Sequence, residues 1–214
     1  MSVRGPVIAV DGPAAAGKGT LAKRLAKALG VPYLDTGLLY RAVGRLVLDA
    51  GDNPADPAEA FAARLTPADL ARKDLRTPDV ARAASEVAAQ PAVREALIAT
   101  QRSFVGPEGA VLDGRDIGTV IFPDAEVKLF ITASAATRAL RRFLQQGGDM
   151  QAPDAALVLK ETQEALSARD LADSQRAVAP LRPAGDALQI ETDHLDADQV
   201  LAQALAYARE RLTR

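Results

Sequence analysis

The segment from Gly12 to Thr20 carries the clearest chemical signal in this chain. Its glycines let the backbone curl so that consecutive N–H groups point at phosphate oxygens, and the helix expected to start there adds partial positive charge. Lys18 would supply a full charge at the β- and γ-phosphates. The segment therefore predicts a phosphate-binding P-loop for a nucleoside triphosphate, made of Gly12, Pro13, Ala14, Ala15, Ala16, Gly17, Lys18, Gly19 and Thr20.

One position departs from the usual P-loop pattern. The residue after Lys18 is Gly19, and the hydroxyl comes one residue later, at Thr20. A hydroxyl directly after the lysine is the usual Mg²⁺ ligand. We therefore expect no direct protein ligand for Mg²⁺, which nucleotide oxygens and water would hold, with Asp113 ordering the water. A turn aspartate without that role is the alternative for Asp113.

Strands and helices must alternate to position this loop. Apolar runs predict strands at Val7–Val10, Tyr33-Leu34, Ala110–Leu112, Val127–Ile131 and Ala187–Ile190. Amphipathic spacing and end signals such as Gly30, Thr77-Pro78, Pro91 and Ser134 predict helices at Lys18–Leu29, Gly37–Leu48, 78–89, 91–104, 135–146, Asp154–Asp173 and Asp198–Leu212. Alternation of this kind indicates an α/β fold, a parallel sheet covered on both faces. The pattern breaks between Asn53 and Leu112, which predicts an all-helical insertion.

Composition excludes several classes of protein. The 26 Lys and Arg against 28 Asp and Glu give a net charge of −2, which argues against binding nucleic acid through bulk charge. There is no Cys and one His, so disulfides, thiolate zinc sites and His-pair metal sites are excluded. No apolar run reaches the ~18 residues that a membrane span needs. Met1 runs almost directly into Val7–Val10, so we expect no signal peptide and a cytoplasmic location.

Missing motifs narrow the choice among P-loop proteins. A GTPase needs an Asn-Lys-x-Asp motif, but the single Asn, Asn53, precedes Pro54. A protein kinase needs His-Arg-Asp, but the single His precedes Leu195, and the Leu-Ser-Gly-Gly signature of transporter ATPases is absent. A small-molecule kinase remains, for one of several nucleoside monophosphates or for shikimate. A non-catalytic nucleotide-binding protein is the alternative from another class.

Five motifs together resemble the bacterial cytidylate kinase family, and they follow one another in matching order along nearly the whole chain: DGPAAAGKGT at 11–20, LDTGLLYR at 34–41, LDGRDIGTV at 112–120, FPDA at 122–125 and RAVAPL at 176–181. The resemblance implies a single domain over 1–214. It would be a P-loop NTPase-type five-stranded parallel sheet with a mostly helical NMP-binding insertion at about 53–105 and a short lid at about 138–172. It also implies γ-phosphoryl transfer from ATP to CMP or dCMP with Mg²⁺, by a monomer without nucleic-acid or membrane partners.

The resemblance assigns the remaining site residues. The catalytic set is Lys18, Arg115, Arg138 and Arg142, and the CMP-binding set is Thr36, Arg41, Ser85, Arg94, Arg115, Asp116, Arg169, Asp173 and Arg176. Thr36 is expected to cap the helix that starts there and to donate to the phosphate. Arg138, Arg141 and Arg142 fall at i, i+3 and i+4 and would clamp the transferring phosphoryl group from the lid.

Alternatives stay open for three of these groups. Arg169, Asp173 and Arg176, at i, i+4 and i+7, would share one helix face if the helix continues that far. A solvated ion-pair ladder is the usual interpretation of such spacing, whereas the resemblance places this face on the ribose hydroxyls. The lid arginines could likewise form a solvated face. Ser85 could be an ordinary helix residue. The stretch between Arg41 and Ser85 is shorter than in better-known members and shows almost no β signal, which leaves the shape of the insertion open.

Overall fold

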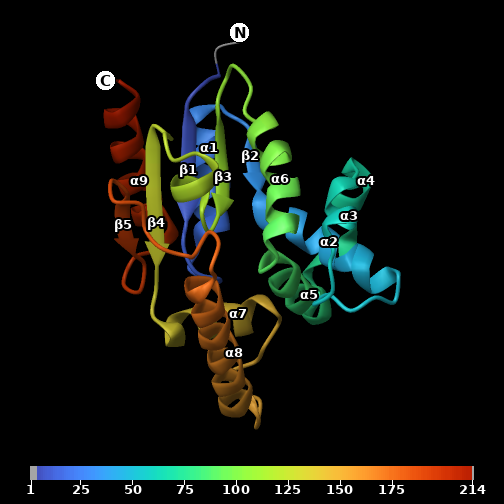
Figure 1. The fold of residues 1–214 in the computed structure, drawn as a ribbon. Coiled ribbons are helices and arrows are strands. Elements are labelled where there is room, and N and C mark those ends of the chain that lie inside the picture. Colours follow the sequence, from blue (N-terminus) through green and yellow to red (C-terminus); the bar gives the residue numbers. More distant parts are fainter. Residues whose placement is uncertain (1–3, 214) are drawn as a thin grey trace.

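A five-stranded parallel sheet runs through the centre of the computed structural model, which describes residues 4–213 (Figure 1). The strands are β1 (Val7–Asp11), β2 (Tyr33–Asp35), β3 (Ala110–Gly114), β4 (Val127–Thr132) and β5 (Leu188–Glu191), in the spatial order β2-β3-β1-β4-β5. All four pairings are parallel, as predicted. All five strands therefore end at one edge, where folds of this kind bind ligands. The expectation about a signal peptide rests partly on residues 1–3, outside the described residues.

Alternating side chains of the central strand pack on both faces of the sheet. Ile8 and Val10 join a cluster with α1 (Lys18–Leu29) and α9 (Ala197–Leu212). Val7 and Ala9 join a second cluster with the end of α6 (Pro91–Ser103) and a π-helical turn, η2 (Ile117–Ile121). The strand has no exposed face, which explains its continuous apolar run. The sequence did not predict η2.

The insertion is helical, as predicted, and has its own apolar cluster. It contains α3 (Glu59–Ala63), α4 (Pro67–Leu70), the 3₁₀ turn η1 (Lys73–Arg76), α5 (Pro78–Ala88) and α6, with no strand within 53–105. Its cluster includes α2 (Thr36–Asp49) through Leu39, Val43 and Val47. Thr77 stands at the N-cap of α5 as predicted, but its hydroxyl donates to the Asp74 carbonyl (3.1 Å) and does not cap the helix.

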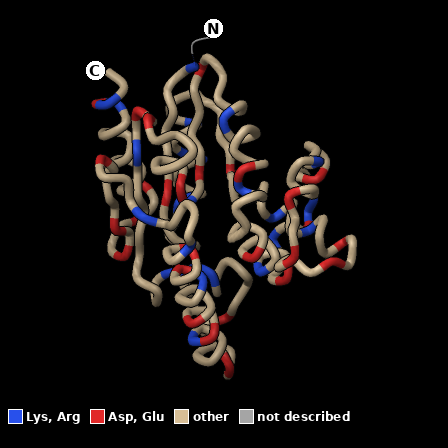
Figure 2. The backbone as a smooth tube through the Cα atoms, viewed as in Figure 1, with Lys and Arg blue, Asp and Glu red and all other residues tan. Residues whose placement is uncertain are grey.

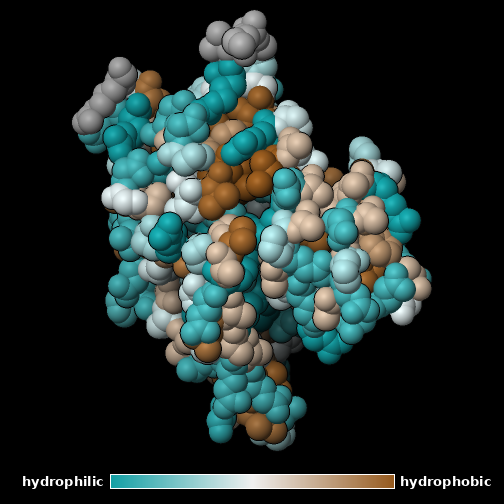
Figure 3. All heavy atoms as spheres, viewed as in Figure 1, coloured by the Kyte–Doolittle hydropathy of each residue, from teal (hydrophilic) through white to brown (hydrophobic). Residues whose placement is uncertain are grey.

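Helices α7 (Ala135–Gln145) and α8 (Ala155–Gln175) pack against each other and project beyond the end of the sheet (Figure 1). Ser134 caps α7 as predicted, accepting the Thr137 N–H at 3.2 Å. Leu144, Leu157 and Leu171 of this pair are exposed, and Figure 3 shows hydrophobic patches near its tip. The division of the chain into one domain with an insertion and a lid stays a prediction. Within residues 4–213, no helix combines the length and apolar character required to cross a bilayer.

Candidate active site

A cavity of about 870 Å³ opens at the carboxyl edge of the sheet, between the P-loop, the insertion and the α7–α8 pair. Its lining includes ten Lys and Arg side chains and five Asp side chains, whereas the whole chain carries a net charge of −2. Figure 2 shows blue segments gathered where the α7–α8 pair meets the ends of the strands. A cleft with this excess of positive charge concentrates polyanions.

The P-loop forms one wall of the cavity. Residues Ala14 to Thr20 line it, whereas Gly12 and Pro13 lie behind. Gly12 has φ +143°, and a Cβ there would lie 2.1 Å from the Ile131 carbonyl oxygen, so only glycine allows this close approach of the loop to β4. Gly17, with φ +94°, is the N-cap of α1. The predicted strand–loop–helix context is confirmed.

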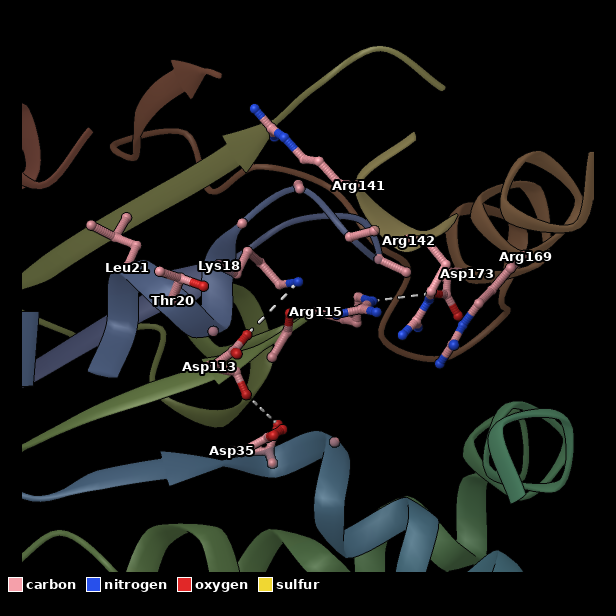
Figure 4. Close-up of a pocket in the computed structure, with 18 of the residues that line it drawn as sticks. Lys18, Thr20, Leu21, Asp35, Asp113, Arg115, Arg141, Arg142, Arg169 and Asp173 are labelled. Atoms are coloured by element: carbon pink, nitrogen blue, oxygen red, sulfur yellow. Dashed lines mark hydrogen bonds and ion pairs between the residues drawn. The ribbon is translucent and has the colours of Figure 1, made fainter. Parts of the chain in front are cut away.

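Lys18 is 6% exposed and extends across the loop. Its ammonium donates to the Pro13 carbonyl (3.0 Å) and lies 3.8 Å from a carboxylate oxygen of Asp113 (Figure 4). Burial, and then the nearby charge of Arg115, lower the pKa of Lys18 to about 8, and Asp113 opposes that change. The lysine is therefore held in a poorly solvated position where an anionic ligand would favour its charged form.

Asp113 is the penultimate residue of β3 and pairs with Asp35, the last residue of β2. Burial raises the pKa of its carboxyl group, and the Lys18 charge lowers it. The Thr36 hydroxyl donates to the Asp113 backbone carbonyl (2.8 Å), so the prediction that Thr36 caps its helix is wrong. Asp35 occupies the N-cap and Thr36 is the first helical residue, because the β2–β3 pairing places the Asp113 carbonyl within reach of that hydroxyl.

Three arginines from different elements meet on the insertion side of the cavity. Arg41 donates to the Leu75 carbonyl (2.8 Å). Burial lowers its pKa, and the neighbouring charges of Arg142 and Arg76 lower it further. Arg76 also pairs with Asp35 at 3.3 Å. Sequence reasoning missed both Arg76 and Asp35 as site residues. Asp35 directly follows the predicted strand Tyr33-Leu34, and this position at the carboxyl end of a strand could have identified it. Arg76 lies in a stretch whose sequence predicted no clear helix or strand.

Arg115 and the end of α8 form an ion-pair group. Arg115 Nε lies 3.1 Å from Asp173 Oδ2 (Figure 4), and Arg176 Nε donates to the Asp173 carbonyl (3.2 Å). Burial, and then Arg115, lower the pKa of Arg169 to about 10. Because α8 ends at Gln175, Arg176 is not on the same helix face as the other two, but the turn still brings it into the cavity.

Two buried guanidinium nitrogens in this group, Arg169 Nε and Arg176 Nη2, have no hydrogen-bond partner. Both residues line the cavity. Buried donors without acceptors are costly. A ligand with hydroxyl or phosphate oxygens would accept hydrogen bonds from both nitrogens. In a solvated ion-pair ladder, by contrast, water would already satisfy such donors.

The far end of the cavity is polar and buried. Arg94 and Asp116 form an ion pair there, and both are at most 5% exposed. The Arg94 guanidinium lies 5.4 Å from the centre of the Tyr40 ring. The Ser85 hydroxyl donates to the Ala81 carbonyl (3.1 Å). Since its hydrogen is used in that bond, the Ser85 oxygen presents acceptor lone pairs to the cavity.

The three predicted lid arginines lie in different positions. Arg142 lines the cavity. Arg141 also lines it and is fixed on Thr192 through that residue's hydroxyl (2.8 Å) and carbonyl (2.6 Å). Arg138 is buried behind the lining, where it pairs with Asp170 (2.6 Å) and donates to the Ala14 carbonyl (3.3 Å). The structure therefore brings together all of the predicted CMP-binding residues but leaves the predicted catalytic Arg138 outside the cavity.

Residues that follow β5 also line the cavity, and sequence reasoning missed them: Thr192, Leu195, Asp196, Ala197 and Val200. Among residues 4–213, no group of three or more His, Cys, Asp and Glu side chains is arranged to hold a metal ion.

Comparisons with known proteins agree on one family. The family model described as cytidylate kinase matches residues 8–210. The cytidylate kinase of Granulibacter bethesdensis is 59% identical over 210 residues, covering 97% of this chain and 99% of its own length. That of Acidiphilium cryptum is 55% identical, covering 97% of each. A crystal structure of an uncharacterized protein from Eubacterium ventriosum has a TM-score of 0.51 at 15% identity, over 96% of this chain and 99% of its own, and shows the fold alone.

Proposed function

The chain belongs to the cytidylate kinase family, an enzyme family that transfers the γ-phosphoryl group of ATP to CMP or dCMP, and we propose that the cavity at the carboxyl edge of the sheet is where it does so. The observation that supports this site most directly is its charge: ten cationic and five anionic side chains line it. ATP and CMP bring about six negative charges together, and repulsion between them must be offset before phosphoryl transfer.

We place the phosphates of ATP on the P-loop. Backbone N–H groups of the Ala14–Thr20 segment and the N-terminus of α1 would bind the phosphates, with Lys18 at the β- and γ-phosphates. Mg²⁺ would neutralise charge on these phosphates. Asp113, whose carboxylate lies 3.8 Å from the Lys18 ammonium, and Asp35, which also lines the cavity, would contact Mg²⁺ through water.

The adenine would extend from the P-loop toward Thr192 and the Leu195–Ala197 segment. Arg141 lines this part of the cavity, and its two hydrogen bonds to Thr192 hold its guanidinium in place. A planar cation fixed in this way can stack on an aromatic base. We therefore assign Arg141 to binding the adenine of ATP, and not to binding the transferring phosphoryl group.

The transferring phosphoryl group would pass between Arg115, Arg142 and Arg41. Arg41 would hold the CMP phosphate, while Arg115 and Arg142 stabilise charge that develops on the γ-phosphoryl group. The nucleophile is a phosphate oxygen of CMP, so the step needs no strong general base. Arg138 reaches the Ala14 carbonyl and Asp170 of α8, so we assign it to holding the lid against the P-loop.

The far end of the cavity would read the base. Cytosine offers an N4 amino donor and acceptors at N3 and O2. Ser85, whose hydrogen is already used, and Asp116 would accept from N4, and Arg94 would donate to N3 and O2. Uracil would instead place its O4 acceptor against these acceptors.

The ribose would lie on Asp173, Arg169 and Arg176. Asp173 can accept from a ribose hydroxyl. Arg169 Nε and Arg176 Nη2, which have no hydrogen-bond partner although Arg176 Nη2 lies 3.9 Å from Asp173 Oδ1, can donate to hydroxyl or phosphate oxygens. The 3′-hydroxyl is sufficient for such contacts, so dCMP should be used nearly as well as CMP.

A panel of CMP, dCMP, UMP and AMP, assayed with ATP and Mg²⁺ by coupled detection of ADP, tests the proposal. We expect kcat/KM for UMP to be at least ~10² below that for CMP, because sites built on hydrogen-bond polarity reject wrong analogues strongly. Ser85→Ala should narrow the CMP/UMP ratio, whereas Ser103→Ala, in an exposed part of α6, should not. Equal use of UMP and CMP by the unaltered protein would refute the assignment of base-reading residues.

Calorimetric titration with CMP alone separates this enzyme from a non-catalytic nucleotide-binding protein, which has no second nucleotide site. We expect CMP to bind without ATP. A monomeric state, a cytoplasmic location and the absence of nucleic-acid partners stay predictions from the sequence.

A further inference from the structure

Asp11, the last residue of β1, is a buried carboxylate that the proposed mechanism does not use. It is 5% exposed and does not line the cavity. Its Oδ1 accepts the backbone N–H of Ile117 (2.9 Å), and its Oδ2 accepts that of Gly118 (2.8 Å). Both carboxylate oxygens therefore accept hydrogen bonds from one short backbone segment, which lies in the connection between β3 and β4.

That segment begins η2 directly after Asp116, which is the N-cap of the π-helical turn. The first N–H groups of any helix lack partners within the helix. The far end of η2 is closed by its own backbone, with Ile121 N–H donating to the Asp116 carbonyl (3.1 Å) and Phe122 N–H to that of Ile117 (2.7 Å). Asp11 supplies the partners at the near end, next to Asp116.

Burial and the backbone hydrogen bonds act on the pKa of Asp11 in opposite directions. Burial raises the pKa of Asp11 to about 7, the N–H groups of Gly118 and Ile117 lower it, Asp116 raises it and Lys18 lowers it. Asp11 also immediately precedes Gly12, the first residue of the P-loop. One side chain thus connects the start of the ATP loop to the segment that carries Arg115 and Asp116.

We propose that Asp11 is a positioning residue: by binding the Ile117 and Gly118 N–H groups it fixes Asp116 against the cytosine, at a set distance from the P-loop. This rests on the proposed function, in which Asp116 reads the base. Misplacement of a contact group by about 1 Å can cost ~10²-fold in rate. We therefore expect loss of the Asp11 contacts to relax base choice even though Asp11 does not touch the nucleotide.

The variant Asp11→Asn keeps the size of the side chain. Its amide oxygen can accept one of the two N–H groups, but its NH₂ opposes the other. We expect the CMP/UMP ratio of kcat/KM to fall at least ~10-fold, measured well below the melting temperature of the variant. Val47→Ala, a truncation in the core of α2 away from the cavity, is the matched control, because it should lower the melting temperature without changing the ratio.

A double-mutant cycle with Asp116→Ala decides whether Asp11 acts through Asp116. In the Asp116→Ala background, Asp11→Asn should change the CMP/UMP ratio by less than ~2-fold. If Asp11→Asn lowers stability but leaves the ratio unchanged in the otherwise unaltered protein, Asp11 is only structural and the inference is wrong. If Asp116→Ala itself leaves the ratio unchanged, the proposed base contact has failed, and the inference fails with it.

Hydrogen exchange on the unaltered protein gives an answer even if Asp11→Asn does not fold. The Ile117 and Gly118 amides should exchange as slowly as amides of the central strands, because their acceptor is buried. Fast exchange of these two amides, beside slow exchange in β1 and β3, would overturn the inference.

Discussion

Replacing Asp116 by Ala should destabilise the protein strongly, because it leaves the Arg94 charge buried without its partner. Arg94 and Asp116 are 4% and 5% exposed. Breaking a buried pair by removing one partner costs about 3–5 kcal/mol, a large part of the ~5–15 kcal/mol by which a domain is stable. For a chain of this size each kcal/mol shifts the melting temperature by about 2–4 °C, so the expected fall is about 6–20 °C.

Replacing both partners should be much less harmful. The double variant Arg94→Met, Asp116→Leu removes both charges and fills a similar volume, and substitutions of this kind are often neutral or stabilising. Glu86→Ala is the matched control, because it breaks the exposed Arg82–Glu86 pair on α5 and should cost less than ~1 kcal/mol. The double variant should lose most of its selectivity for CMP, since two of the three proposed base-reading groups, Arg94 and Asp116, are gone and only Ser85 remains.

Thermal melts and denaturant titrations followed by circular dichroism, without nucleotides, measure these effects. The coupled ADP assay with CMP and UMP then shows whether a variant can change in stability without a change in its preference for CMP over UMP. The reasoning is refuted if Asp116→Ala melts within ~2 °C of the unaltered protein, like Glu86→Ala. It is also refuted if the double variant is as unstable as Asp116→Ala, since unpaired charge would then not be the cause.

Three further predictions concern the phosphate and ribose contacts. Lys18→Ala should lose at least ~10² in kcat with the fold intact by circular dichroism, because it removes a preorganised charge at the transferring group; near-normal turnover would exclude the P-loop lysine from the mechanism. Because burial and Arg115 lower the pKa of Lys18 to about 8, the free enzyme loses this charge as pH rises through that value. The pH profile of kcat/KM for ATP should therefore fall above pH 8, whereas that of Lys18→Arg should not; an unchanged alkaline fall in Lys18→Arg would assign it to another group. Asp173→Ala should raise KM for CMP more than KM for ATP in initial-rate assays; a fall in melting temperature with unchanged CMP kinetics would instead indicate a structural ion pair with Arg115.

The fold could be predicted largely from local sequence signals. The strand β1 has a continuous apolar run because both of its faces are buried, and α1 ends at Gly30 because glycine adopts the required positive φ. Predicted strand and helix bounds agree with the structure within about two residues. The π-helical turn η2 was missed because part of what stabilises its start, the Asp11 carboxylate, lies more than a hundred positions away in the sequence.

The candidate site could be predicted only where residue identity sets the chemistry. The P-loop is such a case, since its glycines, lysine and following helix bind phosphate through local geometry alone. The direction of each long side chain was not predictable, because it depends on which partner the fold places nearby. Arg138 forms an ion pair with Asp170 and Arg141 donates a hydrogen bond to Thr192, although the spacing of both residues from Arg142 predicted one shared helix face.

The sequence by itself determined the alternation of strands and helices, the phosphate loop and the family, because each depends on residues close together in the chain or on motifs in order. Only the tertiary structure decided the hydrogen-bond states of the individual groups. Thr36 bonds the Asp113 carbonyl, Ser85 is left as an acceptor, and Arg94 is buried against Asp116. These outcomes follow from contacts between distant elements at the carboxyl edge of the sheet, where burial removes water and each polar group must find its partner in the protein or in a ligand.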